Sequence, residues 1–554
     1  MRAQRCLTSI VVALLWVVMV LQPARADDAI VQRIEALQAG FPVKVLEQPL
    51  MARRALASFY SARAYNAAWT HPDTRQALIT AVERAADEGL NPDDYHASAL
   101  VQLHARAEAE ASEELQADLD VLFSDAFLML GSHLLEGKVN PQTIHAEWTA
   151  DRRKREMAPI LAEALSHGDI AGALETLRPS HPAYRSLMDA RRFLADLRGQ
   201  PWPTLSSGPA IRPGDRSDRL PGVRERLQAL AFLPDNAADA GEPADATWYD
   251  AELEGVITLF QARHGLEPDG IIGRGTLAAL NLIPLERIHK IDASLERWRW
   301  LPESLGDTHV RVNIAGYELV LVENGVEALR SRVIVGRPFR QTPVFSDRIR
   351  YLVFNPTWTV PRKLMIEDQL PAIIGDPDYL QRLNMSVYSG WGTDRERIDP
   401  STIDWATLSR NNFPYQLVQE PGPQNALGQV KFMFPNQYDV YLHDTPGRGL
   451  FARAERSFSS GCIRVEAAFD LAERLLAGVP GWSRNRIEGV VNASQPVTVM
   501  LPTPVPVHIQ YWTAWVDEQG KLQFRNDVYQ RDARLLAELR KTIQGEHVLT
   551  PQGG

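Results

Sequence analysis

The chain carries the stretch Ser459-Ser460-Gly461-Cys462-Ile463-Arg464, which holds one of its two cysteines. Serine, glycine and arginine are poor neighbours for a buried structural thiol, because such thiols usually pack among apolar side chains. A thiol becomes an effective nucleophile when an imidazole at hydrogen-bond distance can take its proton. The sequence therefore predicts that Cys462 is a catalytic nucleophile and that a histidine lies beside it in the fold.

His443 is the candidate for that histidine. It ends the strand-like stretch Val440-Tyr441-Leu442, and the loop that follows is long enough to fold its ring back onto Cys462. We expect His443 to take the thiol proton and later to return it to a leaving amine. Asp444 is expected to orient the imidazole through its side chain or through its carbonyl, and both alternatives stay open.

The small residues before Cys462 indicate a place where the backbone approaches a substrate closely. We expect the N–H groups of Ser460, Gly461 and Cys462 to form an oxyanion hole, each donor contributing about 3 kcal/mol to transition-state stabilisation. Arg464 holds either this loop or a substrate carboxylate. Tyr441 and Trp358 are either substrate-shaping residues or core residues. The full set assigned to substrate binding is Arg464, Tyr441, Trp358 and Ser459.

The first 26 residues have the features of a cleavable export signal. Basic residues precede an apolar run from Leu7 to Leu21, and the small-x-small pattern Ala24-Arg25-Ala26 follows it. The run is about 15 residues long, short of the roughly 20 that cross a bilayer as a helix. We expect segment 1–26 to be removed on export together with Cys6, which leaves Cys462 without a disulfide partner in the chain.

Composition and charge describe an ordinary globular protein of several domains. Of 554 residues, 45% are hydrophobic and 23% are charged, and the formal net charge is −10. The acidic balance argues against nucleic acid as a partner, because phosphate binding needs a basic face. The 13 histidines show no spacing typical of a metal site, so we predict no metal and no other cofactor. No apolar stretch after the leader is long enough to span a membrane.

Hydrophobic periodicity divides the chain after the leader into a helical part and a β-rich part. Helical spacing predicts an all-α scaffold domain over 27–199, and a stretch rich in Pro, Gly and Ser predicts a linker over 200–214. Short apolar helical stripes predict a compact three-helix module over 215–281, followed by a connecting helix over 282–309. The predicted fold class is multidomain α+β.

The β-rich domain is expected over 310–530, as a β-sandwich-like fold followed by a charged, helical tail over 531–554. The strand pattern stops between about 362 and 424, and we expect this insertion to form a lid over the site. The predicted strands are His309–Ile314, Tyr317–Val322, Ser331–Val335, Arg348–Phe354, Gln429–Phe434, Val440–Leu442, Pro496–Leu501 and Pro506–Trp515.

The three-helix module carries a recognisable set of residues. Phe260-Gln261-Ala262-Arg263-His264-Gly265-Leu266 is followed by Asp269-Gly270-Ile271-Ile272-Gly273 and Thr276-Leu277. This set resembles the peptidoglycan-binding module of bacterial cell-wall enzymes. The resemblance implies a wall-binding role, and the alternative is a module that only packs against its neighbours. For His264 the alternative to binding is a cap or buttress of its helix.

The stretch around Cys462, with His443 upstream, resembles the motif of the L,D-transpeptidase family, in which a histidine precedes Ser-x-Gly-Cys-hydrophobic-Arg or Asn. The similarity extends to other segments of the β-rich domain. These are Gly336 with Gln341-Thr342-Pro343, Phe354-Asn355-Pro356-Thr357-Trp358, Asn425-Ala426-Leu427-Gly428 and Lys431-Phe432. The order of leader, helical scaffold, binding module and lid-bearing domain is similar to the large Gram-negative subclass of this family.

Two positions depart from the family pattern. Many members have histidine immediately before the Gly-Cys pair, whereas this chain has Ser460, so the role of base rests on His443. Many members have serine after the catalytic histidine, whereas this chain has Asp444. The departure at Asp444 leaves the group that orients the imidazole undecided.

The resemblance implies a periplasmic enzyme that forms cross-links in peptidoglycan during cell wall biogenesis and so supports cell shape. Cys462 would attack the carbonyl between meso-diaminopimelate and the terminal D-Ala of a tetrapeptide stem, and His443 would protonate the departing D-Ala. The diaminopimelate amine of a second stem would then aminolyse the thioester. Acylation of Cys462 by carbapenems, and penicillin-binding proteins or other wall synthases as partners, are implied as well.

Two alternatives compete with this expectation. An L,D-carboxypeptidase, or a hydrolase of stem amide bonds, needs only water in place of the acceptor amine. A lid that excludes water disfavours this alternative. The other alternative is a wall-binding scaffold without activity, which the presence of both Cys462 and His443 disfavours.

Overall fold

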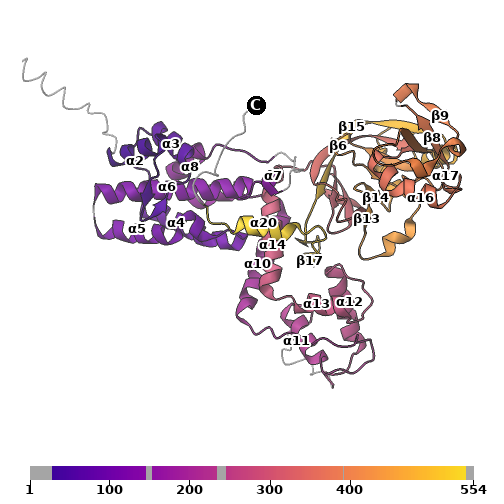
Figure 1. Cartoon of the computed structure of the whole chain (residues 1–554). Coiled ribbons are helices and arrows are strands. Elements are labelled where there is room, and N and C mark those ends of the chain that lie inside the picture. The colour runs from indigo at the N-terminus through magenta and orange to yellow at the C-terminus, as the bar shows by residue number, and fades with distance from the viewer. Residues whose placement is uncertain (1–27, 111, 145–151, 234–244, 391, 544–554) are drawn as a thin grey trace, which may run out of the picture.

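The computed structural model describes residues 28–110, 112–144, 152–233, 245–390 and 392–543. The predicted export signal and the end of the predicted tail lie outside these residues. A helical region and a β-rich domain occupy opposite ends of the molecule, and a small helical module lies beside the link between them (Figure 1). In the described ranges, no helix is both long and apolar enough to cross a membrane.

The helical region is built around α6 (Glu113–Glu136), which is buried from Leu119 to Leu135. A helix apolar on every side must be surrounded by others, and its neighbours pack around it here. Asp120 of α6 accepts hydrogen bonds from the Trp69 amide and the Tyr60 hydroxyl, at 2.9 and 2.7 Å. The other elements are α2 (Asp28–Gln38), β1 (Lys44–Val45), β2 (Gln48–Pro49), α3 (Arg53–Ala62), α4 (Pro72–Arg84), α5 (Ala97–Ala109), α7 (Pro141–Ile144), α8 (Met157–His167), α9 (Ile170–Glu175) and α10 (Pro182–Asp196).

The small module consists of α11 (Leu220–Ala229), α12 (Ala251–Arg263) and α13 (Arg274–Asn281). His264 is buried, accepts from the Arg287 guanidinium at Nε2 (2.8 Å) and donates from Nδ1 to the Phe260 carbonyl (2.7 Å). It therefore buttresses the end of α12. The prediction of a linker over 200–214 is wrong in part, because Leu205 and Ile211 are buried in the core of this module.

The connection between the helical and β-rich parts is α14 (Pro284–Arg299), a helix that is buried along most of its length. The chain returns to it at the end, where α20 (Arg531–Leu539) lies beside α14 (Figure 1). Arg297 of α14 pairs with Asp532 of α20 at 2.7 Å. The predicted strand Pro506–Trp515 does not run on in the large sheet, because Ala514–Val516 (β16) pairs with Leu522–Phe524 (β17) in a separate hairpin that packs on α10 and α14.

The β-rich domain contains a nine-stranded sheet of order β13-β5-β14-β12-β11-β6-β15-β3-β4, and a further pairing of β4 with β5 closes the sheet on itself. Helices α18 (Ala468–Leu475) and α19 (Arg484–Asn492) contribute buried apolar side chains to the same core. The predicted β-rich character of this domain is confirmed. The strands are β3 (His309–Asn313), β4 (Glu318–Glu323), β5 (Val326–Gly336), β6 (Phe345–Phe354), β11 (Val430–Met433), β12 (Leu442–His443), β13 (Ser457–Ser459), β14 (Ile463–Val465) and β15 (Val497–Gln510).

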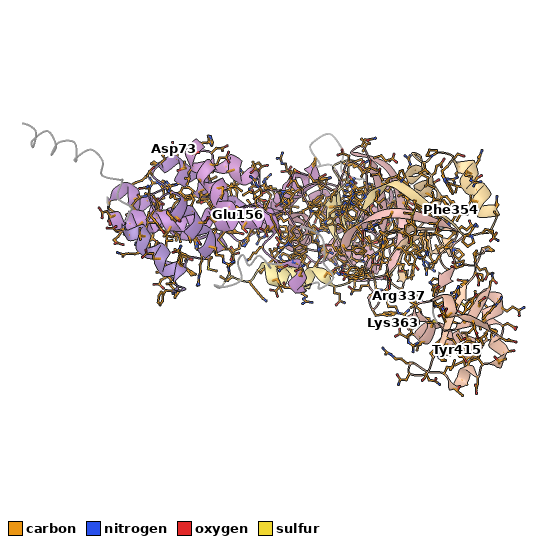
Figure 2. The ribbon with its side chains drawn as sticks, turned by 90° about the horizontal axis from the view of Figure 1, so that it is seen from above. Asp73, Glu156, Arg337, Phe354, Lys363 and Tyr415 are labelled. Carbon is orange, nitrogen blue, oxygen red and sulfur yellow. The ribbon has the colours of Figure 1, made fainter. Side chains whose placement is uncertain are left out.

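The insertion over 362–424, called the lid segment below, was expected to lack strands, and this expectation is wrong. It holds β8 (Met385–Ser389), β9 (Glu396–Ile398) and β10 (Tyr415–Gln419), which join β7 (Trp358–Thr359) in a four-stranded sheet. Its helices are α15 (Arg362–Leu364), the π-helical turn η4 (Met365–Gln369), α16 (Leu370–Gly375) and α17 (Tyr379–Arg382). Figure 2 shows Lys363 and Tyr415 in a lobe that projects from the domain holding Phe354.

Candidate active site

Three adjacent strands, β11, β12 and β14, place the predicted site residues on one face of the large sheet. β12 and β14 are parallel, with Leu442 opposite Ile463 and His443 opposite Arg464. Leu442 and Ile463 are fully buried in the core. Because side chains alternate between faces along a strand, His443 and Arg464 point away from that core, as does Cys462. The structure thus brings the predicted nucleophile and the predicted base onto the same face of neighbouring strands.

The His443 ring is oriented by the Asp444 backbone. Nδ1 lies 2.6 Å from the Asp444 carbonyl oxygen, and since a carbonyl only accepts, Nδ1 carries the proton. Nε2 is then left as the acceptor. Burial and, next, the Arg464 charge lower the pKa of His443 to about 3, so the ring is a neutral base at neutral pH.

The Asp444 side chain does not reach the imidazole, which decides between the two alternatives left open for this residue. Its Oδ2 accepts from the Gln429 amide at 3.0 Å, and its Oδ1 accepts from the Arg448 guanidinium at 3.2 Å. The carboxylate therefore fixes the loop after β12, and only its backbone carbonyl acts on His443.

Cys462 is a free, partly exposed thiol. Its Sγ lies 3.8 Å from the Asp439 carbonyl oxygen, and the Tyr441 hydroxyl is hydrogen-bonded to it. Burial raises the pKa of the thiol, while the hydrogen bonds from Tyr441 and the charge of Arg464 act in the opposite direction. Tyr441, for which a substrate-shaping role and a core role were both left open, thus contacts the Cys462 sulfur. At rest, the site holds a thiol and, on the neighbouring strand, a neutral imidazole.

The loop before Cys462 is held by Ser459, a residue assigned from the sequence to substrate binding. Ser459 is buried, donates from Oγ to the Cys462 carbonyl at 2.5 Å, and accepts from the Gly461 amide at 3.1 Å. Ser459 therefore braces the loop and does not face a substrate. The Gly461 N–H is engaged, so the predicted oxyanion hole reduces to the N–H groups of Ser460 and Cys462.

A second support of this loop comes from the segment after β5. Thr342 donates from its hydroxyl to the Gly461 carbonyl at 2.8 Å and accepts from the Gly336 amide at 2.9 Å. Gly461 itself has a φ of +121°, a backbone conformation that side-chain-bearing residues rarely adopt. These contacts explain why the Gln341-Thr342-Pro343 segment accompanies the cysteine motif.

Arg464 is a largely buried guanidinium with no hydrogen bond or ion pair to any residue that the structure describes, and its Nε is fully buried. It lines a pocket of about 320 Å³ between the large sheet and the lid segment, called the lid pocket below. Trp358 lines the same pocket. The other lining residues are Gln369, Tyr379, Leu383, Met385, Gln419, Gln424, Ala426, Thr445, Pro446 and Gly447.

Arg340, which was not predicted from the sequence, joins the lid segment to the loop before Cys462. Its guanidinium binds Asp368 at 2.6 and 2.9 Å, Glu367 at 2.7 Å, and the Ser460 hydroxyl at 3.0 Å. In Figure 2 the neighbouring Arg337 lies at the junction between the lobe and the main domain. The three residues Arg340, Glu367 and Asp368 form a clamp at the base of the lid segment.

Replacing Arg340 by methionine is expected to loosen the lid segment at its base. Exposed ion pairs each contribute about 0.2–1 kcal/mol, and this clamp combines two carboxylates with one well-packed guanidinium. We expect the amides of 362–375 to exchange with deuterium about tenfold faster in Arg340→Met than in the wild-type protein. Hydrogen exchange followed by mass spectrometry measures this difference.

The matched control is Arg382→Met, which removes an exposed ion pair with Asp376 inside the same lobe. Its effect on exchange at 362–370 should be negligible, because this pair does not touch the large sheet. Equal exchange at 362–375 in Arg340→Met and wild type would show that the clamp does not hold the lid segment.

In the described part of the chain, no group of three or more His, Cys, Asp or Glu side chains is arranged to hold a metal ion. The reactive groups that the structure places at the site are the thiol and the imidazole, with cations around them. Arg337 and Lys431 are the other cations near it. Arg337 lowers the pKa of Arg464, and Lys431 lies opposite His443 in the sheet register.

Comparison with protein families finds three matches in this chain. A scaffold domain matches residues 54–190, a "Putative peptidoglycan binding domain" matches 218–280, and an "L,D-transpeptidase catalytic domain" matches 307–499. Cys462, His443 and Arg464 all fall inside the last of these ranges.

Two curated relatives and two solved structures give the extent of similarity. The "Putative L,D-transpeptidase" of Haemophilus influenzae is 38% identical over 253 residues, 45% of this chain and 50% of its own length. The N-acetylmuramoyl-L-alanine amidase CwlM of Mycobacterium tuberculosis is 37% identical over 82 residues, 14% of this chain and 20% of its own. This chain thus spans half or less of the length of these relatives.

The L,D-transpeptidase structure from Mycobacterium smegmatis shares 11% identity with a TM-score of 0.17, covering 37% of this chain and 58% of its own. The faropenem-derived adduct of L,D-transpeptidase 3 from Mycobacterium tuberculosis shares 15% identity with a TM-score of 0.17, covering 37% and 60%. Residues 307–499 thus match the L,D-transpeptidase catalytic-domain family, after ranges that match a scaffold domain and a peptidoglycan-binding domain in the same chain.

Proposed function

We propose that the protein is a periplasmic L,D-transpeptidase that cross-links the diaminopimelate residues of peptidoglycan stems through a thioester on Cys462. The observation that carries this proposal is a free thiol and a neutral imidazole on one face of neighbouring strands, beside a guanidinium without an ion pair among the described residues. The family of residues 307–499 gives the reaction class, and the domain at 218–280 supports peptidoglycan as the substrate.

The first step forms the thioester. Sγ of Cys462 attacks the carbonyl between diaminopimelate and the terminal D-Ala, and the thiol proton passes to Nε2 of His443. Negative charge then develops on the former carbonyl oxygen, where the N–H groups of Ser460 and Cys462 act as donors. When the intermediate collapses, the C–N bond breaks and His443 gives its proton to the nitrogen of the departing D-Ala.

The second step transfers the acyl group to an acceptor. The side-chain amine of another diaminopimelate attacks the thioester carbonyl, the C–S bond breaks, and the new amide is the cross-link. His443 takes the proton of the attacking amine and returns it to the Cys462 sulfur. Because water in place of the amine would give only hydrolysis, closure of the lid segment over the site would favour transfer by excluding water.

The charges around the site fit a substrate with several carboxylates. Arg464 and Arg337 are cations with no ion pair among the described residues, and a tetrapeptide stem carries free carboxylates close to the bond that reacts. The proposed partners are peptidoglycan stems as donor and acceptor. Wall synthases such as penicillin-binding proteins are further candidates, since they would supply new glycan strands.

The test is mass analysis of muropeptides after incubation of the purified protein with disaccharide-tetrapeptide. Dimers joined between two diaminopimelate residues, together with released D-Ala, are the expected products. Release of D-Ala without dimers would make the protein a carboxypeptidase. No reaction in the presence of both donor and acceptor would overturn the proposal of an independently active enzyme.

Replacing Arg464 by methionine is expected to weaken donor binding without weakening the fold. A buried charge without a partner destabilises a protein, so its removal should leave the thermal midpoint unchanged or higher. Loss of a charged hydrogen-bond donor from a binding site costs about 1.5–3 kcal/mol, so kcat/KM for the tetrapeptide should fall about 10- to 100-fold. Steady-state release of D-Ala measures this change.

The control variant is Arg453→Met, which removes an exposed arginine from the loop between β12 and β14. Its kcat/KM should stay within about twofold of the wild type, since such surface changes rarely exceed 0.5 kcal/mol. An Arg464→Met enzyme that is less stable but equally active would show that Arg464 holds the loop and not the substrate.

A further inference from the structure

Lys431 lies in the active site and has no role in the mechanism described above. It is in β11, where Val430 and Phe432 are fully buried while Lys431 is partly exposed, so its side chain lies on the face opposite the core. In the antiparallel pairing of β11 with β12, Lys431 lies opposite His443. The Nζ atom lies 5.7 Å from the centre of the Tyr441 ring, whose hydroxyl is hydrogen-bonded to the Cys462 sulfur.

The Lys431 ammonium is half-buried without a carboxylate to neutralise it. Burial lowers its pKa, and in the described part of the chain the one charged group that raises this pKa is the Cys462 sulfur. An interaction between two titrating groups is reciprocal, so a thiolate that favours the ammonium is favoured by it to the same extent.

Several other groups face the Cys462 sulfur, and their effects partly cancel. The Tyr441 hydroxyl and the Arg464 charge favour the thiolate, whereas Asp439 opposes it. Asp439 is exposed, so water screens its charge more than that of a half-buried ammonium. The groups around the sulfur are Lys431 of β11, Tyr441 just before β12, Arg464 of β14, and Asp439 of the turn before β12.

We propose that Lys431 is a positioning residue of the reaction, whose ammonium group stabilises negative charge on the Cys462 sulfur across the Tyr441 ring. This inference rests on the proposed function for its catalytic meaning. The side-chain stem of Lys431 packs beside Tyr441 and keeps the hydroxyl directed at the sulfur, while the charge acts on the sulfur through the partly apolar site.

The Lys431 charge also assists the second half of each step, in which the His443 imidazolium gives up its proton. Lys431 is among the groups that lower the pKa of His443, so the imidazolium formed during attack is a stronger acid. A stronger acid gives its proton more readily to the nitrogen of the departing D-Ala. The Lys431 cation thus favours the anionic sulfur during attack and the release of the proton from the imidazolium afterwards.

The experiment is the pH dependence of alkylation of Cys462 by iodoacetamide, in which the thiolate displaces iodide. In Lys431→Met the apparent pKa of the thiol should rise by about one unit, which makes alkylation at pH 7 about tenfold slower. At a pH above the thiol pKa of both proteins, the two rates should be equal, which shows that access to Cys462 is unchanged. Lys431→Arg keeps the charge and should stay within about twofold of the wild type.

The matched control is Lys521→Met, because Lys521 is an exposed lysine in the β16–β17 hairpin, outside the large sheet. Its alkylation profile should coincide with that of the wild type. An unchanged profile in Lys431→Met overturns the proposal. A profile lowered at every pH also overturns it, since it would show a structural role in which the charge has no part.

Alkylation requires no peptidoglycan, so its outcome is independent of whether the proposed cross-linking is found. With the tetrapeptide donor, Lys431→Met should lower kcat about tenfold with little change in KM. A raised KM with an unchanged kcat and an unchanged alkylation profile would assign Lys431 to substrate binding and overturn the proposal.

Discussion

Cys462→Ala should release no D-Ala and form no dimers, a loss of at least about 10⁴-fold in rate. Covalent catalysis cannot proceed without its nucleophile, and the donors and cations that remain can only bind the stem. The same variant should gain no mass on incubation with a carbapenem, whereas the wild-type protein should gain the mass of one acyl adduct. Muropeptide analysis and intact-protein mass spectrometry measure these two outcomes.

Cys462→Ser is the matched variant, because it changes one atom and keeps the loop. A serine hydroxyl is a much weaker acid than a thiol, and a neutral His443 of lowered pKa is a weak base toward it, so this variant should be at least about 10³-fold slower. Both variants should keep the thermal midpoint, since Cys462 is partly exposed. D-Ala release at more than a few per cent of the wild-type rate in Cys462→Ala would place the nucleophile elsewhere.

The placement of Cys462 and His443, the proposed nucleophile and base, could be predicted from the sequence because it is set by short strands. His443 ends one strand and Cys462 precedes the next, and the parallel pairing of β12 with β14 places them on one face. The roles inside the loop were harder to predict. Whether Ser459 faces a substrate or braces its own loop depends on a rotation of one side chain, which a motif does not record.

Contacts between distant segments could not be predicted from local patterns. Arg340 lies in a turn after β5, yet it binds Asp368 in the lid segment and Ser460 beside the nucleophile. Nothing in the residues around Arg340 distinguishes it from an exposed arginine. Lys431-Phe432 was among the segments similar to the family, but the proposed role of Lys431 follows only from the strand register, in which it lies opposite His443.

The wrong predictions about the linker and the lid segment share one physical cause. The average composition of a stretch does not show the single residues that anchor it. The stretch 200–214 is rich in Pro, Gly and Ser, but Trp202 stacks on Arg226 at 3.8 Å and Ile211 pairs with Ile272. In the lid segment, loops rich in polar residues separate β8 and β10, so the two strands were not recognised although they pair over five residues.

His443→Asn should lower the rate of D-Ala release about 10³-fold at pH 7. Asparagine can keep the hydrogen bond to the Asp444 carbonyl through its amide nitrogen, but it has no group that takes and returns a proton. At high pH, where the thiol ionises without help, alkylation of Cys462 should equal that of the wild type. D-Ala release should stay low at the same pH, because the departing amine still lacks an acid.

The acid stability of the large sheet gives an independent control on this interpretation. The folded-state pKa of His443 is about 3, below the value near 6.5 of an unfolded chain, so between these values the unfolded state binds the additional proton. The wild-type protein therefore loses stability as the pH falls below 6.5, by about 2 kcal/mol at pH 5 from this residue alone. In His443→Asn this loss should be absent, as measured by hydrogen exchange of β11, β12 and β14.

An Asn variant that keeps more than a tenth of the wild-type rate would show that the base is another residue. An equal loss of stability in acid in this variant and in the wild type would show that the fold does not lower the pKa of His443.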